Sequence, residues 1–219
     1  MNPSDHSKAL NHPGHAAILR RAVVTAVFTA VVVISGCGKP TDNVPAEKSE
    51  TAAKTDLPPS AESPLAKAAT RGDLAKVKAL IEEGADVNVS DALGRTPLHM
   101  AAFYGRPKTA ALLIASGANV NVKDRVGLTP LHSAVLAGGA EEIELFLDKK
   151  ADIKAASEIG LTPLHLAAAI GNPQLVLLLI QRGADPKSKD REGNTPLSLA
   201  IKNNHPKTTA LLQKYTNSQ

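Results

Sequence analysis

Three histidines recur along the chain at one fixed interval: His99, His132 and His165. Imidazole nitrogens are common zinc ligands, so a series of them is a candidate metal site if the fold brings three together. Consecutive repeated units, however, stack at about the 8 to 10 Å of helix packing, whereas zinc needs nitrogen ligands at about 2.1 Å. The spacing therefore favours a structural role, in which each imidazole hydrogen-bonds adjacent turns, and we expect no metal and no cofactor.

A second group that could do chemistry is the acidic cluster of Glu141, Glu142 and Glu144. Paired carboxylates can carry out general acid–base catalysis, but these three are expected on the outward part of a helix, as a solvated face. Gly138 and Gly139 lack the downstream Lys-Ser/Thr pair of a phosphate-binding loop. The recurring histidines have places set by the repeat, so no Ser-His-Asp set is indicated. We predict that the chain is not an enzyme, has no catalytic residues and takes no small-molecule substrate.

The single cysteine, Cys37, lies where an apolar run gives way to a polar one. Arg20 and Arg21 precede an uncharged run over residues 22–34, which is short for the roughly 20 apolar residues of a membrane span and typical of a signal-peptide core. One cysteine cannot form an internal disulfide, and structural zinc sites usually need two or more thiolates. The basic pair, the apolar run, the segment Ile34-Ser35-Gly36 and then Cys37 together resemble the lipobox of bacterial lipoproteins.

This resemblance implies that residues 1–36 are a signal peptide and that Cys37 becomes the lipidated first residue of an exported, periplasmic protein anchored to a membrane. Gly38, rather than Asp, follows the cysteine, which by the sorting rule of that class favours the outer membrane in a cell that has one. Two alternatives remain: an incidental thiol beside an uncut signal anchor, and a start codon located further along the chain. Residues 37–61, rich in Pro, Ser, Thr, Lys and Glu, are predicted to be a disordered tether.

From about residue 62 onward the sequence is periodic. The tripeptide Thr-Pro-Leu begins at Thr96, Thr129, Thr162 and Thr195, and a weaker copy begins at Ser63. A fixed period of about 33 residues indicates a solenoid of small units, none of which can bury its apolar face alone. Aromatic residues make up only 2% of the chain, which suits thin stacked helices better than a sandwich or barrel. The unit DALGRTPLHMAAFYGRPKTAALLIASGANVNVK, residues 91–123, resembles an ankyrin repeat throughout.

The resemblance covers residues 62–219 and implies an all-α fold, an ankyrin-repeat solenoid of helix-turn-helix units with short β-hairpin loops. Four full repeats are expected at 91–123, 124–156, 157–189 and 190–219, after an N-terminal capping half-repeat at about 62–90. Within a unit, Thr96 can cap the first helix and Pro97 suits its first turn. Gly117 and Gly183 suit the left-handed turn after the second helix, where the second repeat has Lys150 instead, which predicts a local weak point.

In ankyrin repeat proteins the hairpin tips and the exposed side of the first helices form a concave groove, and the resemblance places a binding surface there. The candidate protein-binding residues are Leu93, Arg95, Phe103, Tyr104, Arg125, Val126, Leu128, Leu136, Ile159, Leu161 and Ile170. They form an apolar band with a polar end, and binding patches commonly have an apolar centre and a polar rim. The alternative is that several of these side chains pack between the loops of adjacent repeats and stabilise the fold.

Charge excludes one further class of partner. Beyond residue 36 the chain has 22 basic and 20 acidic residues, with no basic stripe and few aromatic residues, so nucleic acid is not an expected partner. We predict a monomeric, non-catalytic protein–protein interaction module that binds another protein in the cell envelope. Two alternatives stay open: an immunity protein that neutralises a periplasmic toxin, and an exported factor that binds host proteins.

Overall fold

The structure is a computed structural model that describes residues 63–217. The predicted signal peptide, the predicted lipidation of Cys37 and the predicted tether lie outside the described residues. Residues 63–217 form an all-helical solenoid with no β-strand. Its ten helices are α2 (Pro64–Arg71), α3 (Leu74–Glu82), α4 (Pro97–Phe103), α5 (Pro107–Ala115), α6 (Pro130–Ala137), α7 (Ala140–Asp148), α8 (Pro163–Ile170), α9 (Pro173–Gln181), α10 (Pro196–Lys202) and α11 (Pro206–Asn217).

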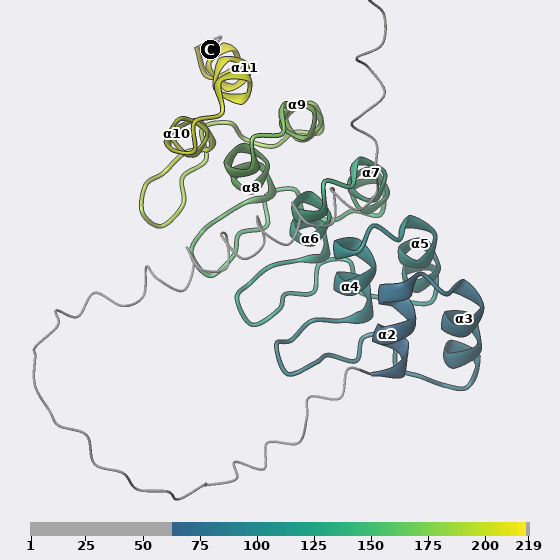
Figure 1. Cartoon of the computed structure of the whole chain (residues 1–219). Coiled ribbons are helices and arrows are strands. Elements are labelled where there is room, and N and C mark those ends of the chain that lie inside the picture. Colours follow the sequence, from purple (N-terminus) through teal and green to yellow (C-terminus); the bar gives the residue numbers. More distant parts are fainter. Residues whose placement is uncertain (1–62, 218–219) are drawn as a thin grey trace, which may run out of the picture. The chain divides into compact units, whose positions relative to one another are not determined.

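The helices are arranged in two rows, as Figure 1 shows. The even-numbered helices follow one another in one row, the odd-numbered helices form a second row, and long loops project from the even-numbered row. Each repeat therefore contributes one helix to each row, and the predicted helix-turn-helix solenoid is confirmed. The capping unit supplies a complete helix pair, α2 and α3, and not the half-repeat that was expected there. No helix within residues 63–217 is long and apolar enough to cross a membrane.

The Thr-Pro-Leu-His motif starts the first helix of each middle repeat. Thr96 is the N-cap of α4 and has an extended backbone, while Pro97 takes the first turn, where its missing N–H is not needed. His99 is the third helical residue and completes a capping box with Thr96. The same arrangement begins α6 and α8, so the start of each of these helices follows directly from the local sequence.

The core is a continuous stack of small layers. In the first full repeat, Leu98, Ala101 and Ala102 are completely buried on one face of α4, and Leu113 of α5 meets them from the second row. Alanine at the inward positions allows neighbouring helices to pack closely, so no large ring is needed to fill the space between them. In the described chain, Phe146 of α7 is the one fully buried aromatic side chain.

The turn after the second helix is left-handed in the first three full repeats, as expected for Gly117 and Gly183. Gly117 and Gly183 have φ angles of 94° and 96°, and Lys150 at the matching place has a φ of 64°. For a residue with a Cβ this region costs about 1 kcal/mol or more, so Lys150 keeps the left-handed turn in an unfavourable conformation, and the local weak point expected there stays a prediction. The turn is nevertheless hydrogen-bonded, since the N–H of Ala151 donates to the carbonyl of Phe146 at 2.8 Å.

Candidate protein-interaction surface

Each projecting loop is a finger whose tip is shaped by one polar residue. In the first full repeat, Asp91 Oδ1 accepts hydrogen bonds from the N–H groups of Leu93 at 2.8 Å and Arg95 at 2.9 Å. Its Oδ2 accepts from the Arg95 guanidinium at 2.8 and 2.6 Å. Burial alone would raise the pKa of Asp91, but the hydrogen bonds and charge of Arg95 outweigh it and lower this pKa below its usual value. The carboxylate thus stays ionised and holds the loop closed.

Equivalent residues shape the other fingers. Asp124 and Asp190 each accept two backbone N–H groups of their own loop, and Ser157 accepts one, from Leu161 at 3.1 Å. No role was expected for these positions, although they recur at the same interval as the histidines, which was a signal that could have identified them. Because the fingers are built in the same way, they present equivalent residues at their tips.

Backbone hydrogen bonds also join each finger to the next. The N–H of Arg125 donates to the carbonyl of Leu93 at 2.9 Å, and the N–H of Glu158 donates to the carbonyl of Val126 at 2.9 Å. The N–H of Arg191 donates to Ile159 in the same way, at 3.0 Å. The accepting residues, Leu93, Val126 and Ile159, have exposed fractions of 48%, 40% and 41%. We call these three residues the tip row.

The structure divides the predicted apolar band into exposed and half-buried parts. Leu128, Leu136, Leu161 and Ile170 are half-buried and pack against the core, so the alternative interpretation, that part of the band serves stability, applies to them. The tip row and Tyr104 are exposed. The band is therefore not one continuous exposed surface, because residues two apart along a finger, such as Val126 and Leu128, have different surroundings.

The aromatic pair at the end of α4 forms a separate feature. The rings of Phe103 and Tyr104 meet edge to face, with centroids 5.3 Å apart and planes at 82°. Phe103 is half-buried and Tyr104 is exposed. Since α4 rises about 1.5 Å per residue from the finger at its N-terminus, this pair lies roughly 10 Å from the fingers along the helix axis. It forms a second edge of the surface rather than a continuation of the tip row.

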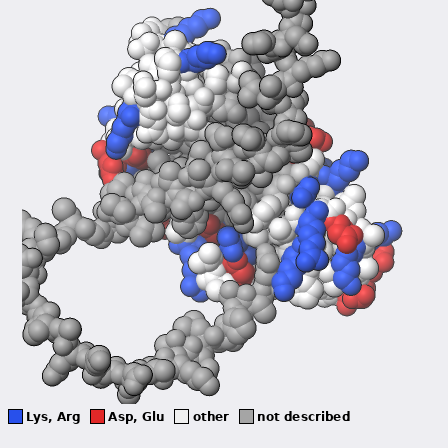
Figure 2. Space-filling view, viewed as in Figure 1, with Lys and Arg blue, Asp and Glu red and all other residues white. Residues whose placement is uncertain are grey.

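The two basic residues of the predicted surface differ in whether their guanidinium groups are free to contact a partner. Arg95 is held by Asp91 within its own finger, so its guanidinium stabilises the loop. Arg125 is exposed, and no ion pair of Arg125 is found within residues 63–217. Figure 2 shows basic and acidic side chains mixed over the end of the molecule that carries α2 to α5, with no large field of one sign on the visible part of that face.

The recurring histidines lie under the fingers and connect consecutive repeats. The His99 Nδ1 atom accepts from the N–H of Thr96 at 3.1 Å, so its Nε2–H donates to the carbonyl of Leu128 in the next repeat at 3.0 Å. His132 and His165 make the corresponding bonds to the carbonyls of Leu161 and Asn194, each at 3.1 Å. The predicted bridging role is confirmed, because both ring nitrogens are engaged in every case.

Burial sets the protonation state of these rings. Desolvation lowers the pKa of His99 and of His165, and it lowers the pKa of the completely buried His132 to about 4. The rings are therefore neutral at neutral pH, with the proton on Nε2. In the described part of the chain, no group of three or more His, Cys, Asp or Glu side chains is placed to hold a metal ion. Ser198 replaces the histidine in the last repeat, where its hydroxyl accepts from the N–H of Thr195 at 2.9 Å.

The acidic cluster on α7 does not form a solvated face, so that expectation is wrong. Glu142 is buried, and a Cβ added at Gly139 would collide with its carboxylate. Glu144 forms an ion pair with Arg182, the C-cap residue that follows α9, and Arg182 also reaches Asp148 at 3.1 Å. The three carboxylates therefore lie in different environments, because neighbouring residues of a helix point in different directions.

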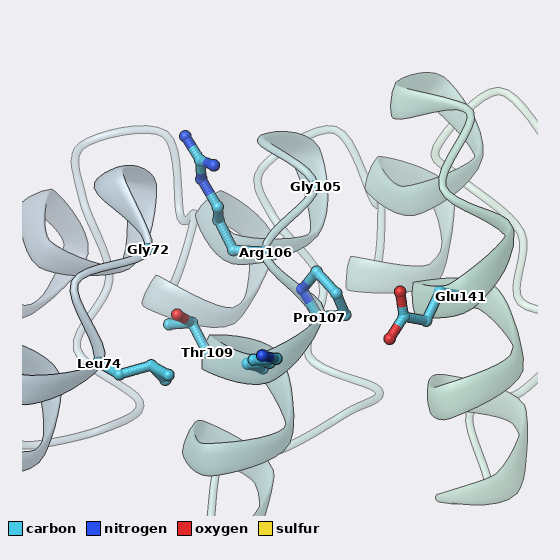
Figure 3. Close-up of a pocket in the computed structure, with 8 residues that line it drawn as sticks. Gly72, Leu74, Gly105, Arg106, Pro107, Thr109 and Glu141 are labelled. Atoms are coloured by element: carbon cyan, nitrogen blue, oxygen red, sulfur yellow. The ribbon is translucent and has the colours of Figure 1, made fainter.

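The third acid, Glu141, is exposed and lines an open pocket between the N-terminal ends of the second-row helices. The pocket has a volume of about 290 Å³, and its lining includes Leu74, Arg106 and Thr109. Figure 3 shows the guanidinium of Arg106 turned away from Thr109, and its Nε–H donates to the carbonyl of Thr70 at 3.2 Å. Among the residues that line this pocket, no acidic side chain forms an ion pair with a basic one.

Comparison with known proteins agrees with this geometry. A family model described as ankyrin repeats, three copies, matches residues 44–124, 65–157, 110–190 and 131–219 in overlapping segments. Together these segments span residues 44–219, well over half of the chain. A search of curated proteins finds no match.

Proposed function

The chain belongs to the ankyrin repeat family and is a protein–protein interaction module, and we propose that it binds its partner through the tip row of Leu93, Val126 and Ile159. The observation that carries this proposal is their equivalent exposure on three consecutive fingers joined by backbone hydrogen bonds. Aliphatic side chains held on a rigid backbone can bind a partner with little loss of conformational entropy. Arg125, which precedes Val126 in the same finger, and Tyr104, on the second edge of the surface, are residue types enriched at interfaces.

A capture experiment with envelope extract tests this surface. A variant with Leu93→Glu, Val126→Glu and Ile159→Glu is expected to lose a partner that the unmodified chain retains in stoichiometric amount, because three charges would be buried unpaired in the interface. Its free energy of unfolding should change by less than about 0.5 kcal/mol per site, since exposed positions tolerate substitution. Mass spectrometry of the retained proteins and urea unfolding measure the two effects.

The matched control places the same charges on apolar residues elsewhere. Leu74 and Ile201 are 38% and 56% exposed and lie outside the predicted band. A Leu74→Glu, Ile201→Glu variant should retain the partner. Equal loss of the partner in both variants, or retention by both, would contradict binding through the tip row. The identity of a partner that depends on the tip row then decides between the three candidate functions, because it would be an envelope protein, a toxin or a host protein.

We further propose that the module is exported, acts as a monomer and is anchored in the periplasm through lipidated Cys37. The support is the order of Arg20, Arg21, the apolar run 22–34 and a single cysteine. A Cys37→Ser substitution is expected to move the protein out of the membrane fraction, because a lipid-modified thiol would be its anchor. Mass spectrometry of the N-terminal peptide should find an acylated Cys37 in the unmodified protein. A mature protein that retains Arg20 to Ile34 would contradict cleavage and favour an uncut anchor.

A further inference from the structure

The beginning of α5 lacks the capping acceptor that two other second-row helices have. At the start of α3, Asp73 accepts from the N–H of Lys76 at 3.0 Å. At the start of α9, Asn172 accepts from the N–H of Leu175 at 3.1 Å. The N-cap residue of α5 is Arg106, whose side chain forms no cap bond, and the first turn of α5 contains no acidic residue. The first N–H groups of α5 are therefore left without an acceptor from the described chain.

The side chain of Thr109 adds a buried donor at the same place. Thr109 is the third residue of α5 and is only 1% exposed, yet within residues 63–217 no hydrogen bond of its hydroxyl is found. It lines the open pocket of about 290 Å³, and Figure 3 shows its oxygen directed toward the N-terminal end of the helix, on the side of Gly72. A buried hydroxyl without a partner costs free energy, which an acceptor bound in the pocket would restore.

The same three residues begin the last helix, where the surroundings differ. The tripeptide Pro-Lys-Thr at residues 107–109 recurs at 206–208, and the hydroxyl of Thr208 also has no hydrogen-bond partner. The Thr208 side chain is completely covered, whereas Thr109 lines the pocket. The equivalent residue of α9 is the buried Leu175, so the fold accepts an apolar side chain at this position. The start of α11 therefore serves as an internal control for the start of α5.

We propose that the pocket at the start of α5 binds a phosphate group, either as the free ion or carried by a partner molecule. The N–H groups of Lys108 and Thr109 and the Thr109 hydroxyl are donors at the N-terminal end of the helix, where the helix dipole favours a negative charge. The ammonium group of Lys108 is exposed and forms no ion pair within residues 63–217. This number of donors suits the several oxygens of a phosphate better than the two oxygens of a carboxylate.

The other charged side chains around the pocket limit the affinity of this site. The guanidinium of Arg106 is turned away from Thr109. Glu141 lines the pocket from α7 and brings a negative charge, and the buried carboxylate of Glu142 lies next to Gly105, which also lines the pocket. We therefore expect weak, millimolar binding of phosphate. Removal of the Glu141 charge should strengthen this binding, because like charges repel.

Titration of the isotope-labelled full chain with sodium phosphate, followed by nuclear magnetic resonance at constant ionic strength, tests the site. The amide signals of Lys108 and Thr109 are expected to shift saturably, whereas those of Lys207 and Thr208 should not. Thr109→Val should weaken the binding at least about tenfold, because a hydrogen bond to a charged group is lost, and Thr208→Val should leave it unchanged. Lys108→Gln should weaken the binding roughly threefold, and Glu141→Gln should strengthen it roughly twofold.

Separate titrations with sodium acetate and O-phosphoserine identify the bound group. Acetate is expected to bind more weakly than phosphate. Tighter binding of O-phosphoserine than of inorganic phosphate would indicate a phosphate carried by a partner, and the reverse order would indicate the free ion. Equal shifts at the starts of α5 and α11, an affinity unchanged by Thr109→Val, acetate binding as tight as that of phosphate, or the absence of saturable shifts would overturn the proposal. None of these variants alters the tip row, so these outcomes leave the proposed function unaffected.

Discussion

Replacing Gly127 by alanine is expected to lower the free energy of unfolding by roughly 3 kcal/mol, whereas Gly193→Ala should cost about 1 kcal/mol. The two glycines occupy the same turn in different repeats and have similar φ angles, 79° and 81°. A Cβ at Gly127 would lie 2.6 Å from the backbone nitrogen of Glu158, while a Cβ at Gly193 would meet nothing within 4 Å. Of these two glycines, only Gly127 has a following finger against it.

The difference between the two variants measures how tightly consecutive fingers are joined. Both substitutions place an alanine in the left-handed region, which costs roughly 1 to 2 kcal/mol. At Gly127 the neighbouring finger must also move, and the bond from Glu158 N–H to the Val126 carbonyl is weakened, which adds about 1 kcal/mol or more. Urea unfolding followed by circular dichroism compares the two. Equal costs would show that the finger shifts freely, and the interval of the tip row would then not be rigid.

Acidification is expected to destabilise the protein through its buried histidines. The pKa of His132 falls from its ordinary value of 6.5 to about 4 on folding, so the unfolded chain binds more protons between these values. Stability from this residue is complete above about pH 6.5 and is lost as the pH falls toward about 4. A shift of this size corresponds to about 3 kcal/mol for His132. His99 and His165 act in the same direction, because burial also lowers the pKa of each.

A His132→Gln variant isolates this contribution. Glutamine can accept from the N–H of Thr129 and donate toward the carbonyl of Leu161, but it does not titrate. The stability advantage of the unmodified protein over the variant should therefore shrink by about 3 kcal/mol between about pH 7 and about pH 4. Urea unfolding at a series of pH values measures this difference. A pH-independent difference would mean that His132 is not held neutral by burial.

The repeated architecture could be predicted from the residues alone, because its signals are local. The dipeptide Thr-Pro starts a helix at Thr96 and at the equivalent position of each later repeat. In the first of these helices, Leu98, Ala101 and Ala102 form one apolar stripe. The histidine bridges could also be predicted, since recurrence at the period of the repeat indicates a structural series rather than a ligand cluster. Residues that recur at a fixed sequence interval take equivalent positions in successive structural units, so the 33-residue period was sufficient to predict a solenoid.

The exposure of the band could not be predicted in this way, because it depends on contacts between repeats. Val126 and Leu128 are two residues apart in one finger and equally apolar, yet Val126 lies at the tip and Leu128 packs on the core. Glu142 was expected in solvent, and its burial depends on the glycines around it. Each side chain is exposed or covered according to what the adjacent repeat places against it. Hydrogen bonds between fingers and close approaches to glycine therefore set the candidate binding surface, and a repeat pattern does not encode them.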